Sequence, residues 1–411
     1  MVMARPKILL LSAYRSDSHG YWSDWLQTDL DADWQVLELP GRYFRWRIRG
    51  NPLSWLDALS RVLDGWQPER ILATSMVDIA TIKGLFPALA DVPCSYYFHE
   101  NQFAYPVAAG QHSSVDPLMV QLYGALAADE LLFNSRFNQY SFLDGVDALI
   151  KRLPDQLPVG IRARLEGKCR WLPVPVRTPV TVTATARSPI AVKTADDAEP
   201  SGLVEGVPNT DSFIPLSYSG VLTREPLLLW NHRWEYDKQP EDFLALLLEL
   251  NDLGVGFRLA LLGPRPKQIP AALTAIRQRF GDVICVDGRV SREEYIGWLT
   301  QADVVVSTAI HEFQGVSVLE AAALGAIPLV PDALCYREQY PPLCRYPPGD
   351  MAAAGRRLIP LLAQPQPELT LRPWLVANQQ MEGDNRIHTP TSASERWQHW
   401  LLSVKSMGLG R

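Results

Sequence analysis

Short apolar runs alternate with longer segments of helical spacing along most of this chain, and this alternation allows few folds. Strands of a parallel sheet covered by helices on both faces are nearly continuous apolar runs, because neither face meets water. Amphipathic segments such as Glu241–Leu250 and Glu293–Leu299 lie between the runs. The runs are Ile8–Ser12, Trp34–Leu39, Arg70–Thr74, Cys94–Phe98, Glu130–Asn134, Cys169–Leu172, Leu227–Trp230, Arg258–Leu262, Val283–Val286, Asp303–Ser307 and Ile327–Val330. The pattern predicts an α/β protein with parallel sheets.

The alternation breaks once, between Arg177 and Pro226, where Thr, Pro, Ala and Ser predominate and helical spacing is lost. A chain of 411 residues suits two domains of about 150 to 200 residues each. We expect an N-terminal domain over 1–178, a connection with a flexible insertion over 179–225, and a C-terminal domain over 226–385. A β-hairpin appended to one domain is the alternative for the connection.

The last segment, 386–411, contains one further predicted helix. Its apolar residues recur at helical spacing after the possible caps Ser392 and Ser394. These apolar residues are Trp397, Trp400, Leu401 and Val404. A stripe with two tryptophans requires a packing partner elsewhere in the protein.

Composition excludes several classes of protein. Apolar residues make up 47% and charged residues 20% of the chain, which is typical of globular domains. The net charge of -6 means that a polyanion would need a local basic patch. Five scattered cysteines without a C-x-x-C pair disfavour zinc sites and disulfides, so we expect a cytoplasmic protein. The apolar run from Lys7 to Leu11 is too short for a membrane span or a signal peptide, so membrane insertion is not expected.

The motifs of other nucleotide-binding classes are absent from the sequence. No G-x-x-x-x-G-K-[S/T] segment occurs, which disfavours a P-loop NTPase. The first predicted strand is followed by Tyr14–Gly20 rather than by G-x-G-x-x-G. Asp29, Asp31 and Asp33 have D-x-D spacing, but they precede a strand and so lie away from the expected ligand edge.

The strongest local signal is the segment from His311 to Glu320, which runs from a predicted strand into a predicted helix over Val318–Leu324. Gly315, Val316 and Ser317 fall where that helix should begin, and unpaired N–H groups at a helix start form a phosphate site. Glu312 and Glu320 lie eight residues apart, and their carboxylates can accept hydroxyls of a sugar and of a ribose. The alternative is that Glu320 caps a turn or pairs with a basic residue.

A second signal is the loop from Asn231 to Pro240, which follows the first strand of the second half. Strand ends of this kind form the ligand edge of a parallel sheet. Arg233 and Lys238 on this loop can neutralise a diphosphate, the arginine through its fork and the lysine as a point charge. Two solvated surface cations are the alternative.

In the first half, an apolar strand runs directly into four polar residues flanked by aromatic side chains, namely His99, Glu100, Asn101 and Gln102. A histidine here can exchange a proton or hydrogen-bond a sugar, although a lone histidine is more often structural. Two weaker candidate pairs follow other predicted strands. We expect them to face the same interdomain cleft as His99–Gln102. They are Ser18 with His19, and Asn134 with Ser135.

The segment from Arg42 to Arg49 interleaves four arginines with aromatic residues. Arg42, Arg45 and Arg47 can contact phosphates while Trp46 or Tyr43 stacks on a base. A solvated strand or loop with snorkelling arginines is the alternative. A second basic cluster lies in the same half and comprises Arg162, Arg164, Lys168 and Arg170.

Together these residues resemble the GT-B glycosyltransferases, and within them the retaining family 4 group. That group carries an Arg-x4-Lys loop, matched by Arg233 and Lys238, and a Glu-x7-Glu pair, matched by Glu312 and Glu320. The resemblance implies two Rossmann-like domains facing a cleft, with a C-terminal helix that crosses back.

The N-terminal half is similar to the tRNA-queuosine mannosyltransferase family. The matching segments are Leu39-Pro40 with Trp46-Arg47, Phe98–Gln102 with Tyr105-Pro106, and Phe133–Ser135 with Phe137-Asn138. The family has a glycine pair where this sequence has Ser16-Asp17, and the insertion at 177–226 is longer than the family needs. The resemblance implies transfer of mannose, with retention, from GDP-mannose to the cyclopentenediol of queuosine in tRNA, without a metal or a bound cofactor.

The resemblance also implies roles for individual residues. Arg233, Lys238 and the amides of Gly315–Ser317 would stabilise the leaving diphosphate, Glu312 would orient the sugar, and Glu320 would bind the ribose. His99 would face the acceptor hydroxyl or the donor sugar. Two other functions stay open: the same donor chemistry on a glycan, lipid or small metabolite, and a non-catalytic RNA-binding protein on this scaffold. An exposed arginine stripe beside the cleft would favour tRNA.

Overall fold

The computed structural model describes residues 5–106, 114–176, 192–193, 221–222, 224–266, 268–363 and 393–408. The insertion predicted over 179–225 therefore lies almost entirely outside the described residues. Two short strands within it, β7 (Val192–Lys193) and β8 (Val221–Leu222), pair antiparallel. Among the described residues, no helix has the length and apolar character needed to cross a membrane.

The first six-stranded sheet has the order β2-β1-β3-β4-β5-β6, and all its pairings are parallel. Its strands are β1 (Lys7–Arg15), β2 (Asp33–Pro40), β3 (Arg70–Thr74), β4 (Cys94–Phe98), β5 (Glu130–Phe133) and β6 (Cys169–Trp171). Every residue of β3 and β4 is buried, whereas the edge strand β2 is half-buried. Full burial on both faces explains the continuous apolar runs in the sequence.

The second sheet has the order β11-β10-β9-β12-β13-β14 and is also parallel throughout. Its strands are β9 (Leu227–Trp230), β10 (Arg258–Leu262), β11 (Ile284–Gly288), β12 (Val304–Val306), β13 (Ile327–Pro331) and β14 (Arg345–Tyr346). In chain order this is the 3-2-1-4-5-6 arrangement of dinucleotide-binding folds. The two-residue strand β14 was not predicted, because it is too short to give an apolar run.

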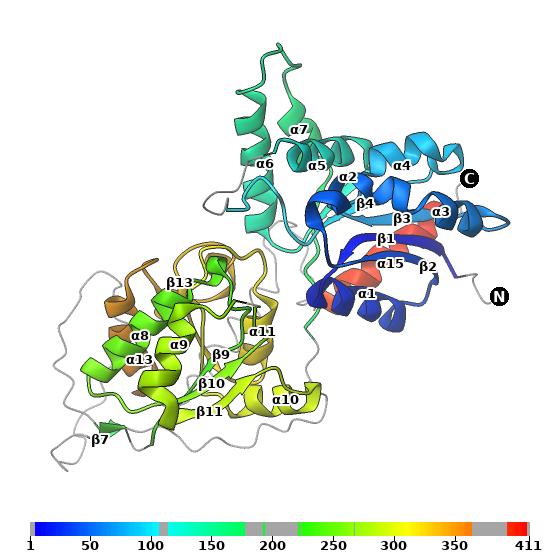
Figure 1. Ribbon diagram of the computed structural model, residues 1–411. Helices are drawn as coiled ribbons and strands as arrows, with labels where there is room; N and C mark the ends of the chain where they lie inside the picture. The colour runs from blue at the N-terminus through cyan, green and yellow to red at the C-terminus, as the bar shows by residue number, and fades with distance from the viewer. Residues whose placement is uncertain are drawn as a thin grey trace, which may run out of the picture.

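Helices cover both sheets (Figure 1). Those of the N-terminal part are α1 (Asp17–Asp29), α2 (Phe44–Ser54), α3 (Leu56–Leu63), α4 (Ile79–Leu85), α5 (Asp116–Ala127), α6 (Arg136–Ile150) and α7 (Ile161–Glu166). Those of the C-terminal part are α8 (Pro240–Asp252), α9 (Ala271–Phe280), α10 (Arg292–Gln301), α11 (Val316–Ala323), α12 (Tyr336–Gln339) and α13 (Met351–Ala363). Local signals fix several starts, such as the capping box of Ser291 and Glu294 at α10.

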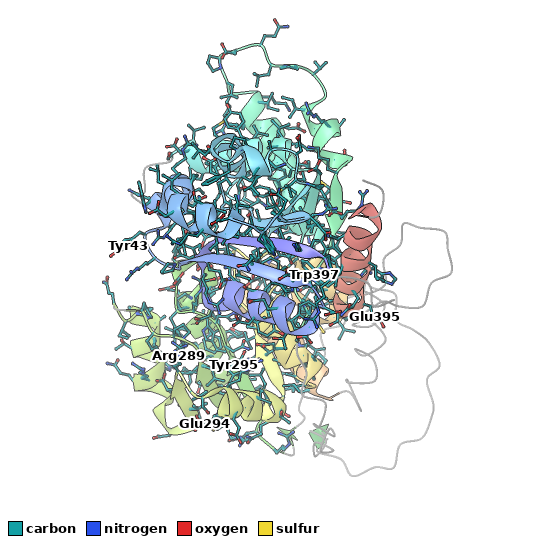
Figure 2. The ribbon with its side chains drawn as sticks, turned by 90° about the vertical axis from the view of Figure 1, so that its right-hand side faces the viewer. Tyr43, Arg289, Glu294, Tyr295, Glu395 and Trp397 are labelled. Atoms are coloured by element: carbon teal, nitrogen blue, oxygen red, sulfur yellow. The ribbon has the colours of Figure 1, made fainter. Side chains whose placement is uncertain are left out.

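The final helix, α15 (Ala393–Gly408), crosses back to the first sheet (Figure 1). Trp397 is fully buried there against Trp22, Trp25 and Tyr97 (Figure 2). This packing confirms the crossing helix and supplies the partner that its apolar stripe required.

The segment from Arg42 to Arg49 is not the solvated strand or loop that was the alternative interpretation of its arginines. Phe44 already begins helix α2, and Tyr43 precedes it in a left-handed conformation with φ 59°. The alternation of arginine and aromatic residues imitates a strand, and the helix forms because Ile48 and Asn51 can be buried on one face.

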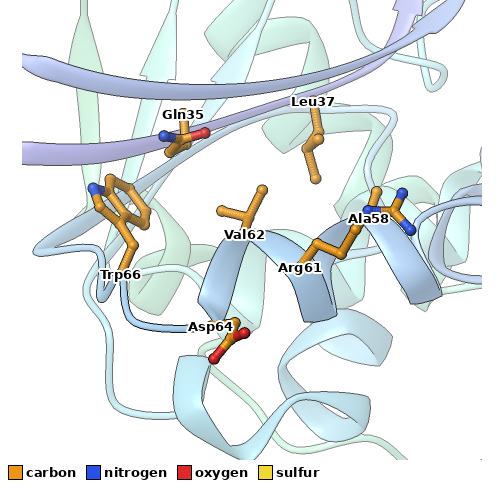
Figure 3. Close-up of a pocket in the computed structure, with 7 residues that line it drawn as sticks. All are labelled: Gln35, Leu37, Ala58, Arg61, Val62, Asp64 and Trp66. Carbon is orange, nitrogen blue, oxygen red and sulfur yellow. The ribbon is translucent and has the colours of Figure 1, made fainter.

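A shallow hollow of about 410 Å³ lies between the edge strand β2 and helix α3 (Figure 3). Gln35 and Leu37 face it from the strand, and Arg61 and Val62 from the helix. Because β2 is the outermost strand of its sheet, this hollow is separate from the loops that follow β4, β9 and β12, where the candidate functional residues lie.

Candidate active site

The order of the second sheet places the two strongest sequence motifs side by side. The order in which strands are added to the sheet reverses between β9 and β12, and ligands of such sheets bind beyond the carboxyl ends of the strands at this switch point. The loop from Asn231 to Gln239 follows β9, and the loop from Ser307 to Gly315 follows β12. The Thr308 hydroxyl joins them by donating to the carbonyls of Lys238 and Gln239, at 2.8 and 3.0 Å.

Lys238 is buried between these loops and pairs with the first carboxylate of the Glu-x7-Glu motif. Its Nζ donates to Glu312 Oε2 at 2.9 Å and to the His311 carbonyl at 2.8 Å. Asp237 Oδ2 lies 3.3 Å from the same Nζ, and this carboxylate is also buried. Lys238 is therefore not a solvated surface cation. Two of its three protons are used by Glu312 and His311, so the third remains available to a ligand or to Asp237.

Glu312 is ionised at any physiological pH. Burial by itself would raise the pKa of its carboxyl, but the charge and hydrogen bond of Lys238 outweigh burial and hold the pKa at about 2. The backbone N–H of Gly315 also donates to this carboxylate. The negative charge of Glu312 thus lies at the N-terminus of helix α11.

The start of α11 has the geometry that an anion site requires. Gly315 precedes the helix with φ 64°, a conformation that favours glycine. The helix begins at Val316, two residues earlier than predicted. Because Glu312 uses the Gly315 amide, the N–H groups left without a partner among the described residues are those of Val316 and Ser317.

Glu320 lies one turn further along α11. Its carboxylate accepts from the Tyr295 hydroxyl at 3.0 Å and from Arg292 at 2.7 Å. The Tyr295 hydroxyl in turn accepts from Asn231 Nδ2 at 3.1 Å, which connects Glu320 to the loop after β9. The alternative that Glu320 pairs with a basic residue is therefore realised, although the carboxylate still has acceptor capacity for ribose hydroxyls.

We expect Glu320→Ala to weaken nucleoside-diphosphate binding about tenfold or more, because both ribose acceptor oxygens are lost. Isothermal titration calorimetry with GDP measures this affinity. Glu293→Ala, which removes an exposed carboxylate from the neighbouring helix α10 and leaves its capping box intact, is the matched control. An unchanged affinity for Glu320→Ala would contradict the ribose assignment.

His232, on the loop after β9, was not among the predicted site residues. Burial lowers its pKa to about 4, with the charge of Lys238 adding to the effect, so the ring is neutral. Its Nε2 faces the Val306 carbonyl at 3.2 Å and must carry the proton, which leaves Nδ1 to accept from the Ser317 hydroxyl at 3.4 Å. His232 thus holds the first turn of α11 against β12. Its position directly after the β9 strand was the available signal.

Arg233 extends from the loop after β9 toward the N-terminal part of the protein. It pairs with Glu235 at 2.9 Å and is hydrogen-bonded to Tyr105. Its charge reaches His19 and Glu100 as well. Tyr105 also contacts the His311 ring at a centroid distance of 4.4 Å. The structure therefore brings the predicted donor loop and the His99–Gln102 loop to one place, across the two sheets.

His99 is enclosed by aromatic rings. The rings of His19, Trp22 and Tyr97 lie 4.2, 4.6 and 4.6 Å from its own, measured between centroids. Burial lowers the pKa of His99 well below its ordinary value, so its imidazole is neutral. Its Nε2 is buried and has no hydrogen-bond partner among the described residues.

His19 and Ser18 flank His99. Burial lowers the pKa of His19 to about 4, and its Nδ1 is hydrogen-bonded to the Ser16 hydroxyl. Ser18 lies at the exposed start of α1, with its hydroxyl 3.3 Å from that of Ser16. Ser16, where the resembled family has a glycine, therefore orients the histidine.

Asn101 and Asn134 hold the loop together from within. Asn101 is fully buried, and its Nδ2 donates to Asn138 and Ser141. Asn134 donates to the His99 carbonyl at 2.8 Å. Gln102 Nε2 reaches Glu100 at 3.3 Å. For Asn101, this burial assigns a supporting role in place of the direct acceptor contact that we predicted, because its donors are already satisfied.

Glu100 faces the donor loop and titrates near neutrality. Burial raises its pKa to about 7, with Arg233 opposing the rise and Asp237 adding to it. Between about pH 4.5 and 7, the folded protein keeps this proton while the unfolded chain loses it, so stability falls as pH rises through that window. Burial raises the pKa of Glu338 to about 7 as well, which acts in the same direction.

We expect Glu100→Gln to flatten this dependence, because one group contributes at most about 1.4 kcal/mol per pH unit. Urea unfolding at several pH values between 4.5 and 7.5 measures the slope. Asp116→Asn, at an exposed helix start, should leave the slope unchanged. An equal slope in the wild type and in Glu100→Gln would contradict the raised pKa.

The segment from Arg42 to Arg49 forms an exposed basic and aromatic face. Arg42 and Arg45 are exposed and Arg47 is partly exposed. Tyr43 is 70% and Trp46 52% accessible, and Tyr43 points away from the ribbon into solvent (Figure 2). Arg49 pairs with Asp78 at 3.0 Å. Arg42, Arg45 and Arg47 thus lie at the surface, whereas Arg49 is held by an ion pair.

The second basic cluster is not an open patch. Arg162 pairs with Asp144 and Asp147, at 2.7 and 2.9 Å. Lys168 donates to three backbone carbonyls at the end of α5, and Arg170 to the Cys169 carbonyl. The fold thus uses donors of these three residues, whereas Arg164 is exposed, and contact of the cluster with a nucleic acid stays a prediction.

The fold is shared with glycosyltransferases of known structure. Sucrose-phosphate synthase from Thermosynechococcus elongatus superposes with a TM-score of 0.60 at 15% identity, covering 98% of both chains. HepE of Anabaena, in complex with UDP and glucose, gives 0.60 at 12% identity, covering 97% of this chain and 99% of its own. The two sheets and the crossing helix define the GT-B fold.

Sequence comparison narrows this class. Residues 7–176 match the family model described as tRNA-queuosine alpha-mannosyltransferase N-terminal. A Drosophila melanogaster protein named tRNA-queuosine alpha-mannosyltransferase is 32% identical over 346 residues, which cover 83% of each chain. The chain belongs to the tRNA-queuosine alpha-mannosyltransferase family.

Proposed function

We propose that this glycosyltransferase moves mannose from GDP-mannose, with retention of configuration, onto the cyclopentenediol of queuosine in tRNA. The observation that carries the proposal is the buried Lys238–Glu312 pair beside the open start of α11, on the loop whose Arg233 acts electrostatically on His19 and Glu100 of the N-terminal part. Family membership supports the acceptor, and the exposed arginine face supports an RNA. The reaction belongs in the cytoplasm, where tRNA is modified.

We assign a separate role in the reaction to each group of site residues. Negative charge builds on the diphosphate as the glycosyl bond breaks, and Arg233, the free proton of Lys238 and the amides of Val316 and Ser317 stabilise it. Glu312 accepts sugar hydroxyls and Glu320 those of the ribose. The neutral His99 hydrogen-bonds a hydroxyl of the acceptor or the sugar. The departing phosphate assists removal of the acceptor proton on the same face, so retention needs no protein nucleophile.

The direct test incubates the protein with radiolabelled GDP-mannose and tRNA with or without queuosine. Label should enter only the queuosine-containing tRNA, and an α-mannosidase should release it if configuration is retained. Activity should persist in EDTA, because we assign the charge stabilisation to protein groups. Absence of label from both tRNAs across several nucleotide sugars would leave the other acceptors, a glycan, lipid or small metabolite, or a non-catalytic RNA-binding role.

We expect Arg45→Ala to raise the KM for tRNA several-fold and to reduce its dependence on salt, because a phosphate contact releases counterions. kcat should change little, since Arg45 lies outside the reacting centre. Arg152→Ala, an exposed arginine at the end of α6, is the matched control. Equal salt dependence for Arg45→Ala and the wild type would place the RNA on another face.

A further inference from the structure

The four residues Leu172–Pro175, which follow β6, are held by several distant elements at once. All four residues are buried. Each backbone carbonyl accepts a hydrogen bond from a different side chain. The donors are the Tyr97 hydroxyl to Leu172 at 2.9 Å, Trp397 Nε1 to Pro173 at 2.9 Å, Gln314 Nε2 to Val174 at 2.8 Å and the Tyr21 hydroxyl to Pro175 at 2.9 Å.

The backbone donors of this segment are also satisfied. The Leu172 N–H bonds the Phe133 carbonyl at 2.7 Å, and the Val174 N–H bonds Gln314 Oε1 at 3.0 Å. Pro173 and Pro175 have no N–H, and their rings restrict the backbone. A short segment is rigid when all its backbone polar groups are paired and two of its φ angles are fixed. It can therefore fix the positions of the side chains bonded to it relative to one another.

Gln314 is the member of this set that belongs to the donor loop. It lies between Glu312 and Gly315 and is buried. Its side-chain oxygen accepts from the Val174 N–H, and its Nε2 donates to the Val174 carbonyl. Its own carbonyl accepts from Gln339 at 2.7 Å. Two residues later, Val316 packs against the core cluster that contains Trp22, Tyr97 and Trp397. The start of α11 is thus fixed to the N-terminal part of the protein, not only to its own sheet.

The other end of the same set reaches the acceptor loop. Tyr97 and Trp22 both contact the His99 ring, with centroids 4.6 Å away. Trp397 contacts Tyr97 at 5.3 Å and Trp22 at 5.7 Å. A continuous series of packed groups therefore runs from His99 through the aromatic rings and Leu172–Pro175 to Gln314 and the start of α11.

We infer that Gln314 is a positioning residue, which sets the phosphate-binding start of α11 in register with His99 by clamping Leu172–Pro175. The inference rests on the proposed function of these two sites. A displacement of about 1 Å between reacting groups can cost about 100-fold in rate. The clamp acts on relative position and leaves the phosphate contacts themselves intact, so it should affect kcat more than donor affinity.

Gln314→Met tests the clamp, because methionine keeps the volume of glutamine and loses both hydrogen bonds. We expect kcat for transfer to fall about tenfold or more, while the dissociation constant for GDP changes by less than about threefold. Trp397→Phe, at the other end of the segment, keeps a ring and loses the bond to Pro173, and it should lower kcat in the same way by a smaller factor. Gln398→Ala removes a glutamine bond from α15 to the Asp29 carbonyl and is the matched control.

A second readout follows the relative position of the two sheets without any acceptor. Cys285 is the exposed cysteine of the five and lies on β11, and Val159 is fully exposed near α7. Spin labels on Cys285 and on Val159→Cys should give a narrow distance distribution by pulsed electron resonance in the presence of GDP. Gln314→Met should broaden that distribution, and Gln398→Ala should leave it narrow.

Unchanged kcat and an unchanged distance distribution in folded Gln314→Met and Trp397→Phe would overturn the inference. A lower Tm with wild-type kcat at low temperature would also overturn it, since the clamp would then be structural alone. Failure of the proposed function has a different signature, because the wild type itself would then label no tRNA. The distance measurement would still decide for or against the clamp in that case.

Discussion

Lys238→Met should reduce the transfer rate by about 100- to 1,000-fold, as expected for loss of one preorganised group that stabilises a leaving anion. The same substitution should destabilise the fold by about 3–5 kcal/mol, because Glu312 and Asp237 would remain buried without their cation. Methionine is one atom shorter than lysine but equally unbranched, so most of the packing around the side chain is preserved. Steady-state kinetics and urea unfolding measure the two effects separately.

A double variant separates catalysis from folding. Lys238→Met with Glu312→Gln removes both partners of the ion pair, so most of the lost stability should return while activity stays low. Lys151→Met, at the exposed end of α6, should match the wild type in both assays. A folded Lys238→Met protein with a rate within threefold of the wild type would refute the placement of the diphosphate beside Lys238.

Trp397→Ala should lower the free energy of unfolding by about 3–5 kcal/mol, the range for truncation of a buried aromatic side chain. Trp397 is fully buried among Trp22, Trp25, Tyr97 and Trp400. The cavity would open directly under β1 and β4, because the crossing helix covers this face of the first sheet. The urea midpoint monitored by tryptophan fluorescence and by circular dichroism measures the change.

Two further variants calibrate this result. Trp397→Phe should cost less than Trp397→Ala, since a ring still fills part of the space. Leu402→Ala, at a 54% exposed position of the same helix, should shift the midpoint little. If Trp397→Ala unfolds at the same urea concentration as Leu402→Ala, α15 does not contribute to the N-terminal core in solution.

Much of the fold could be predicted because burial leaves a direct trace in the sequence. All eleven predicted strands are present, and helices α8 and α10 span the segments where helical spacing was found. The conformation of Arg42–Arg49 could not be predicted in this way. Most of its aromatic and basic residues face solvent and give no periodic pattern. The helix depends on the burial of Ile48 and Asn51, and this burial is provided by neighbours that the local sequence does not reveal.

In the candidate site, too, some features could be predicted from the sequence and others could not. The positions of Arg233, Lys238, Glu312 and Glu320 followed from motif spacing, and the GT-B fold places their loops beyond the ends of β9 and β12. Motif spacing does not show which residue forms an ion pair or hydrogen bond with each of these side chains. The pairing of Lys238 with Glu312, and the use of Arg162 and Lys168 within the fold, depend on residues more than ten positions away in sequence.

The fold class could be predicted from the sequence because it depends on local periodicity, and the two loop motifs because they depend on spacing within single segments; the family followed from the resemblance of those motifs. The three-dimensional packing was needed to show that Lys238 keeps Glu312 ionised, that burial keeps His99 neutral, and that Gln314 hydrogen-bonds Val174. Each of these properties arises from burial and from charges or donors contributed by remote segments. Electrostatic and hydrogen-bonding partners of this kind exist only once the two sheets and the crossing helix have come together.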